Sequence, residues 1–216
     1  ALREGAVEDL LAVCGIDHSV VLQPQQQAES ARGDTQQFLG ASRAQAVRSE
    51  RLAGAGGRNV PVQSGKEALD PGEGEGDIGG LDIGVEKNGL YVDSARTFPV
   101  GKVTAQAEKL LEVTWDALER GIEQAWAGRR LTDISHAVER RAKSGGFSVV
   151  RSLVGHGIGR QMHEDPQVPN FGPPNQGPIM EVGLVLAIEP MVNVGGSDVF
   201  TLDDGWTIVT SDKSLS

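Results

Sequence analysis

The chain has 216 residues, a mass of 22.8 kDa and a formal net charge of −10, which allow one large domain or two small ones. This charge argues against nucleic acid as a direct partner, because phosphate binding needs clustered lysine and arginine. No apolar run approaches the roughly 20 residues that span a bilayer, and no signal peptide opens the chain. A single cysteine, Cys14, excludes an internal disulfide framework. We therefore expect a cytoplasmic protein with no membrane partner.

Residues 1–76 and 77–216 differ in sequence character. The stretch from Leu22 to Asp70 is rich in Gln, Ala, Ser, Arg and Gly, and its large apolar residues keep no steady period. Such a composition is as typical of disordered or loosely docked chain as of a compact fold, although a helix over 35–52 is compatible with it. We therefore divide the chain into a divergent or poorly ordered N-terminal region, 1–76, and a patterned region, 77–216.

The first patterned element is a hairpin. Two apolar-rich runs, Ile78–Val85 and Leu90–Phe98, flank the dipeptide Asn88-Gly89. This dipeptide is the strongest short hairpin signal, because a type I′ turn needs positive φ at both central residues. The sequence therefore predicts two antiparallel strands joined by a two-residue turn.

The register of this hairpin brings two acidic residues together. A two-residue turn sets Asp82 opposite Ala95 and Asp93 opposite Gly84, so both carboxylates project from one face and lie diagonally across the ladder, about 7 to 8 Å apart at Cα. Carboxylates this close repel each other and are costly to desolvate, and divalent cations about 3.5 to 4 Å apart would relieve both effects. Two alternatives stay open. One or both side chains face solvent or cap a turn, or a three-residue loop reverses the parity.

Helices and further strands follow the hairpin. Thr104 is a suitable N-cap for a helix that reaches about residue 122, and a second helix begins near residue 132 and ends at Gly145-Gly146, a pair typical of a C-cap. Its basic run, 139–143, is interpreted as a solvated helix face. Strands are expected over 147–154, 183–189 and 206–210. This order predicts an α+β fold in which helices back a mostly antiparallel sheet.

Three further residues are candidates for the same site. His156 lies between glycines directly after an expected strand, where glycines let another backbone or a ligand approach closely. His163 follows in a loop that can present it to a substrate. Glu189 ends an apolar run, and a carboxylate at the end of a buried strand needs a partner such as a metal ion. A lone histidine is more often structural, and two others receive no role: His18 and His136.

The segments that hold these residues together resemble one family. Residues 77–216 closely resemble bacterial type I methionine aminopeptidases, which have the pita-bread fold, a curved antiparallel sheet backed by helices. The resemblance is carried by Gly76–Ile78, Leu81–Gly84, Asp93-Ser94, Gly155–Gly159, His163–Asn170, Ala187–Met191 and Asp204–Thr207. No single segment is decisive, whereas their order and spacing together are specific.

The resemblance implies a monomeric metalloaminopeptidase that removes the initiator methionine from nascent polypeptides near the ribosome. It implies two divalent metal ions, of Co, Mn, Fe or Zn, held by Asp82, Asp93, His156 and Glu189. Glu189 would also transfer a proton, and His163 would hydrogen-bond the substrate. Met162 and Trp206 would line the pocket for the methionine side chain, and the alternative for both is ordinary core.

Two features depart from the family pattern. The family has a further, metal-bridging glutamate beyond the position of Ser216, so the resemblance implies a chain that lacks the C-terminal segment. Residues 1–76 contain no Cys-His-Gly-like segment, because Cys14 and His18 are not in that arrangement. The alternative function is therefore a catalytically inactive pita-bread fragment or pseudoenzyme that binds a peptide or protein partner. A prolidase-like relative is a third reading, against which the segments HEDPQVPN and DGWT argue.

Overall fold

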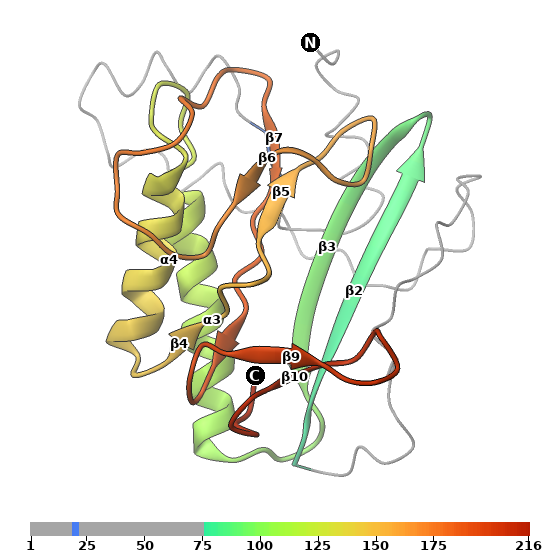
Figure 1. The fold of residues 1–216 in the computed structure, drawn as a ribbon, viewed down its shortest axis with the longest axis vertical. Helices are drawn as coiled ribbons and strands as arrows, with labels where there is room; N and C mark the ends of the chain where they lie inside the picture. Colours follow the sequence, from blue (N-terminus) through green and yellow to red (C-terminus); the bar gives the residue numbers. More distant parts are fainter. Residues whose placement is uncertain (1–18, 22–75) are drawn as a thin grey trace.

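The computed structural model describes residues 19–21 and 76–216, and all elements named here belong to these residues (Figure 1). The helices among them are α3 (Ala105–Ile122) and α4 (Thr132–Ser144). The strands are β1 (Ser19–Val21), β2 (Ile78–Lys87), β3 (Leu90–Pro99), β4 (Ser148–Val149), β5 (Gly155–Gly157), β6 (Glu164–Val168), β7 (Val185–Ala187), β8 (Val192–Asn193), β9 (Val199–Thr201) and β10 (Ile208–Thr210).

Antiparallel strands form the centre of the described part. One sheet has the order β1-β7-β5-β6, and each neighbouring pair in it is antiparallel. The two helices lie on one side of β5, β6 and β7, and the long β2–β3 hairpin lies on the other (Figure 1). This arrangement agrees with the predicted α+β class. No helix in the described ranges is long and apolar enough to cross a membrane.

The β2–β3 hairpin has the register that the turn sequence predicts. Asn88 and Gly89 have φ angles of 58° and 77°, which is the positive-φ pair of a type I′ turn. Asp82 pairs with Ala95, and Gly84 pairs with Asp93. The two acidic residues therefore lie diagonally across the ladder on one face.

Each helix starts and ends near its expected limits. The Thr104 Oγ1 atom accepts a hydrogen bond from the Ala107 N–H at 3.2 Å, which makes Thr104 the N-cap of α3. Helix α4 begins at Thr132, but its N-cap, Leu131, offers no side-chain acceptor. It ends at Gly145, and the following Gly146 has a φ of 88°, a conformation that favours glycine.

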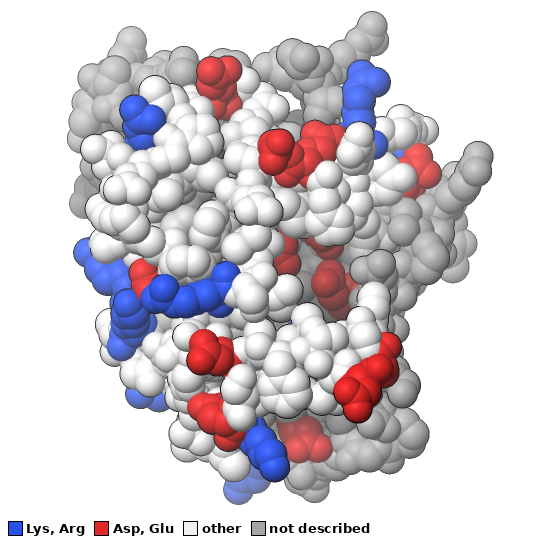
Figure 2. Space-filling model, viewed as in Figure 1, with Lys and Arg blue, Asp and Glu red and all other residues white. Residues whose placement is uncertain are grey.

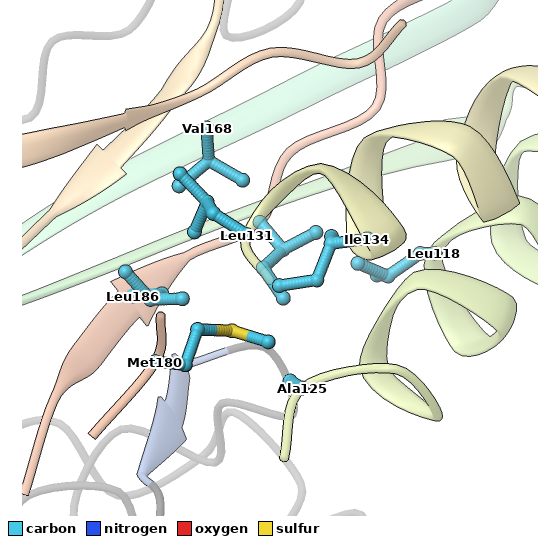
Figure 3. Packing of buried hydrophobic residues seen from close by; sticks show 8 residues of the cluster. Leu118, Ala125, Leu131, Ile134, Val168, Met180 and Leu186 are labelled. Atoms are coloured by element: carbon cyan, nitrogen blue, oxygen red, sulfur yellow. The ribbon is translucent and has the colours of Figure 1, made fainter. Parts of the chain in front are cut away.

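Apolar side chains of the described residues form two core clusters, and one of them lies between the helices and the strands of the main sheet. Figure 3 shows Leu118 of α3 and Ile134 of α4 directed toward Val168 of β6 and Leu186 of β7. Three of these four side chains are 0–1% exposed, and Leu118 is 7% exposed. Burying an aliphatic side chain of this size contributes about 1.5–3 kcal/mol. This core fixes α4 against the strands that carry the candidate site.

Three strand predictions were partly wrong. In place of a strand over 147–154 the structure has only the short strand β4, and the strands expected over 183–189 and 206–210 are the shorter β7 and β10. The described residues also contain strands that were not predicted: β1, β6, β8 and β9. The helix considered over 35–52 lies outside the described residues.

The interpretation of 139–143 as a solvated helix face was partly wrong, because only Arg140 and Lys143 in this run are exposed. Glu139 is 8% exposed and Ala142 is fully buried. Arg141 is paired with Asp116 of α3. Because α4 packs on α3 along this side, the charged residues there meet partners in the protein as well as solvent.

Candidate metal centre

The hairpin delivers two carboxyl groups to the site. Asp93 of β3 is half-buried, Asp82 of β2 is exposed, and the two side chains lie within hydrogen-bonding reach of each other. Both line a cavity of about 340 Å³ that Glu189 also lines. The Tyr91 N–H donates to the Gly159 carbonyl at 2.7 Å, which ties β3 to the loop that follows β5.

The glycines on both sides of His156 allow the neighbouring strands to approach β5 closely. A Cβ atom on Gly155 would lie 2.4 Å from the Ala187 carbonyl oxygen, and one on Gly157 would lie 2.3 Å from the Asp165 carbonyl oxygen. Both distances are far below van der Waals contact, so β6 and β7 approach β5 more closely than any side chain permits. His156 itself is 7% exposed. The glycine frame noted in the sequence thus has a steric purpose.

The imidazole of His156 is directed at two carboxylates. Its Nδ1 atom lies 2.8 Å from the Gly157 carbonyl oxygen, an acceptor that favours a proton on Nδ1. Its Nε2 atom lies 3.5 Å from Asp93 Oδ2 and 3.4 Å from Glu189 Oε1. The His163 ring lies 4.3 Å away, centroid to centroid, at 56°. Five residues from distant parts of the sequence therefore meet: Asp82, Asp93, His156, His163 and Glu189.

The position of Glu189 follows from strand pairing. His156 of β5 pairs with Ala187 of β7, and Glu189 lies two residues beyond that partner. Residues two apart on an extended chain project to the same side. Glu189 is therefore carried toward His156, while Ile188 between them is buried in the core.

The electrostatics show an excess of negative charge that a cation would relieve. Burial raises the pKa of Glu189, the nearby His156 lowers it, and the Asp93 and Asp82 charges raise it again, to about 7. Burial likewise raises the pKa of Asp93, but hydrogen bonds to His156 and Asp82 outweigh it and lower the pKa below its usual value. Burial lowers the pKa of His156, whereas Asp93, the Gly157 carbonyl and Glu189 together raise it.

The side chains of the cluster offer the kinds of ligand atom that divalent cations bind. The distances between these side chains are those of ion pairs. Carboxylate oxygens and one imidazole nitrogen are ligands that Mn, Fe, Co and Zn accept. Within the described part of the chain, no group of three or more His, Cys, Asp or Glu side chains is arranged to hold an ion as it stands. The carboxylates instead approach His156. Figure 2 shows acidic side chains in a hollow near the middle of one face.

A second recess, of about 520 Å³, adjoins the two histidines. His156 and His163 line it together with Gln161, Glu164 and Gln167. His163 is exposed there, at the start of β6. Its ring is thus open to a molecule that enters beside His156.

Met162 and Trp206 lie in different surroundings. Met162 packs against Gly84, where an added Cβ would lie 2.1 Å from its Cε atom. Gly84 is the ladder partner of Asp93, so Met162 lies beside the acidic cluster. Trp206 is 49% exposed, in the turn between β9 and β10, and lines neither of the two cavities described above. Ordinary core is therefore excluded for Trp206, and a role in substrate binding stays a prediction for both.

Two further residues near the site were not predicted from the sequence. Asn170 is 1% exposed, and its Nδ2 atom donates to the Glu189 carbonyl oxygen at 3.0 Å. Glu139 is buried on α4 and accepts a hydrogen bond from the Gly172 N–H. Asn170 belongs to the segment His163–Asn170 that carries the family resemblance, but no local pattern indicates its hydrogen bond to Glu189. Nothing in the basic run around Glu139 indicates burial.

Comparisons with known proteins place these residues in context. Residues 43–212 match the family model Peptidase_M24, metallopeptidase family M24. The chain is 56% identical over 142 residues to a methionine aminopeptidase of Clostridium perfringens, covering 66% of this chain and 57% of that protein. It is 53% identical over 138 residues to methionine aminopeptidase 1 of Bacillus subtilis, covering 64% and 56%.

Solved structures agree. The crystal structure of methionine aminopeptidase from Thermotoga maritima matches with a TM-score of 0.64 and 46% identity, covering 65% of this chain and 56% of that one. The enzyme from Rickettsia prowazekii matches with a TM-score of 0.64 and 40% identity, covering 65% and 57%. The predicted pita-bread α+β fold is confirmed. This chain spans a little more than half the length of the relatives it matches.

Proposed function

Since this chain belongs to metallopeptidase family M24, we propose that it removes the N-terminal methionine from nascent polypeptides by hydrolysis at a dinuclear metal centre. Its similarity to bacterial methionine aminopeptidases supports this function, although it spans little more than half of their length. The proposal includes action as a cytoplasmic monomer close to the ribosome. The substrate is the free N-terminal methionine of a polypeptide.

One observation carries the proposal. The Nε2 atom of His156 lies within 3.5 Å of carboxylate oxygens from Asp93 and Glu189, and Asp82 adds a third carboxyl group beside Asp93. Gathering three acids around one imidazole is electrostatically unfavourable unless a cation shares the site. A structural role would not require such a cluster.

Different residues of the chain would bind the metal ions, transfer the proton and contact the substrate. Asp82, Asp93, His156 and Glu189 would hold the ions. When bound, divalent ions lower the pKa of water and polarise a carbonyl group. Glu189 would accept a proton and return it to the leaving amine. His163 would donate a hydrogen bond to the substrate at the carbonyl oxygen, where negative charge develops.

The substrate would reach the site through the recess beside His156 and His163. Met162, packed on Gly84 next to Asp93, would contact the methionine side chain, as would Trp206. The exposure of His163 allows the contact with an incoming peptide. No finding favours the alternative of an inactive binding protein.

The test is a metal-titrated peptidase assay. The chain, and the same chain extended by the codons that follow in its gene, would be mixed with Met-Ala-Ser peptide over a range of Mn²⁺ or Co²⁺. Free methionine would be measured by mass spectrometry, with N-acetylated peptide as the control for a free amine. Release from the free peptide and not from the acetylated one is expected, and Glu189→Gln should abolish it, whereas the exposed Asp203→Asn should not. If neither form releases methionine, the proposal fails, and peptide binding without release would support the inactive alternative.

A further inference from the structure

Glu189 has its backbone held at a point where the strand ladder has already ended. Strand β7 stops at Ala187, so the Glu189 carbonyl lies beyond the last ladder pair among the described residues. Asn170 supplies one from its side chain, with Nδ2 donating to that carbonyl at 3.0 Å. Asn170 is 1% exposed, so its amide has little freedom and the hydrogen bond fixes the direction of the Glu189 peptide.

The segment that carries Asn170 is in turn fastened to α4. The Gly172 N–H donates to Glu139 Oε2 at 3.1 Å, and the Gly172 carbonyl oxygen lies 3.3 Å from His136 Nδ1. Both Glu139 and His136 belong to α4. The two polar groups of one residue, Gly172, are thus held by side chains one helical turn apart.

Charged groups hold Glu139 in place for this contact. Its Oε1 atom lies 2.8 Å from Lys143 Nζ and 3.3 Å from Arg151 Nη2. The Arg151 guanidinium also lies over the Phe171 ring, 4.6 Å from its centroid. A cation between a carboxylate and an aromatic face restrains both. Phe171 lies between Asn170 and Gly172, so three consecutive residues are held by distinct contacts.

We propose that Asn170 and Glu139 are positioning residues. They orient the Glu189 carboxylate for metal binding and for proton transfer, and helix α4 anchors their contacts. This inference rests on the proposed function and assigns a role to two residues outside the acidic cluster. Within the described part of the chain, the Glu189 carboxylate forms an ion pair with one side chain, His156. Its placement therefore depends on its backbone, and the backbone depends on Asn170. Partners of this kind typically change metal affinity by about 10- to 100-fold when removed.

A matched pair of variants separates positioning from simple loss of packing. Asn193 is fully buried, and its Nδ2 atom donates to the Gly196 carbonyl at 2.8 Å, so Asn193→Ala removes the same kind of bond away from Glu189. Asn170→Ala and Asn193→Ala would be titrated with Mn²⁺ by calorimetry, and their melting temperatures compared. We expect both to lower the melting temperature, and Asn170→Ala alone to weaken Mn²⁺ binding by about tenfold or more.

A second pair keeps the proposal testable if Asn170→Ala does not fold. Glu139→Gln keeps an oxygen to accept the Gly172 N–H, whereas Glu139→Ala removes it, so Mn²⁺ affinity should be near normal in the first and reduced in the second. Equal Mn²⁺ affinity in each matched pair overturns the proposal. If the unaltered chain binds no Mn²⁺, the proposed function fails. In that case the rate of amide hydrogen exchange over 185–190 tests the positioning role. Faster exchange in Asn170→Ala than in Asn193→Ala supports the role, and equal rates in the two variants overturn it.

Discussion

Glu189 Oε1 lies 3.4 Å from His156 Nε2 because Glu189 directly follows a strand that pairs with β5. His156 stands opposite Ala187, the last residue of β7, and Glu189 lies two residues further along the chain. The pairing is close because glycines flank His156. The acidic cluster is therefore a consequence of strand register, and changes to the register should disperse it.

Replacing Gly157 by alanine should disrupt the site from its backbone. The new Cβ would lie 2.3 Å from the Asp165 carbonyl oxygen, so β5 and β6 would have to separate. A loss of about 1–3 kcal/mol in the free energy of unfolding is expected, as for other overpacked sites, and would be measured by urea denaturation. Gly80→Ala is the control, because its nearest neighbour would be at 3.8 Å. Equal stability of the two variants would contradict this account of β5.

The type I′ turn should be sensitive to a Cβ at its second central residue. Gly89 has a φ of 77°, and an L-residue in that conformation costs about 1–2 kcal/mol. Gly89→Ala should lower the free energy of unfolding by that amount, whereas Asn88→Gly, which tolerates positive φ, should change it little. A stable Gly89→Ala variant with intact hairpin signals in NMR spectra would show that the turn does not control the register.

Glu139 should make stability depend on pH in the acid range. Burial raises the pKa of Glu139, but Lys143, the Gly172 N–H and Arg151 outweigh it and lower the pKa below its usual value of 4.5. The folded state therefore releases this proton more readily than the unfolded state. The stabilisation is present above pH 4.5 and is lost as the pH falls through the lower, folded-state pKa. Between pH 6 and pH 3, the free energy of unfolding of Glu139→Gln should change less with pH than that of the unaltered chain. Glu181→Gln, which alters an exposed residue, is the control and should behave like the unaltered chain.

In the metal-free protein, Glu189 should make stability depend on pH in the opposite direction to Glu139. Its pKa is raised from 4.5 to about 7, so between these values the folded state keeps a proton that the unfolded state has released. Stability should fall as the pH rises through this window. The raised pKa of His156 acts with the same sign. The melting temperature of Glu189→Gln should therefore depend less on pH than that of the unaltered chain. Saturating Mn²⁺ should also reduce this pH dependence in the unaltered chain, because metal ligands must be deprotonated. An unchanged slope in Glu189→Gln would contradict the raised pKa.

Local signals in the sequence predicted the parts of the fold that local chemistry controls. The Asn88-Gly89 turn determines φ at two residues, and the parity of the whole hairpin follows from it, including the common face of Asp82 and Asp93. Thr104 likewise marks the start of α3, because its side chain satisfies a backbone N–H that the helix leaves open.

The remaining errors come from contacts between distant segments. Strand β6 contains Asp165 and Pro166, which are depleted in strands, and it forms because β5 pairs with it. Glu139 has a basic sequence context, yet it is buried because its partners Arg151 and Gly172 arrive from other elements. Neither pairing has a periodic signal in the sequence. The Asn170 contact with Glu189 depends in the same way on β6 and β7, which pair with β5 from opposite sides.

Binding of Mn²⁺ to the purified chain tests the central claim most directly. Isothermal titration calorimetry would be applied to the unaltered chain, to Asp93→Asn and to Asp203→Asn, which removes an exposed carboxylate from the turn between β9 and β10. We predict that the unaltered chain binds Mn²⁺, that Asp93→Asn weakens binding at least about tenfold because one of the proposed carboxylate ligands is lost, and that Asp203→Asn has no effect. Absence of Mn²⁺ binding, or equal affinity in the two variants, would contradict a metal centre built from Asp82, Asp93, His156 and Glu189.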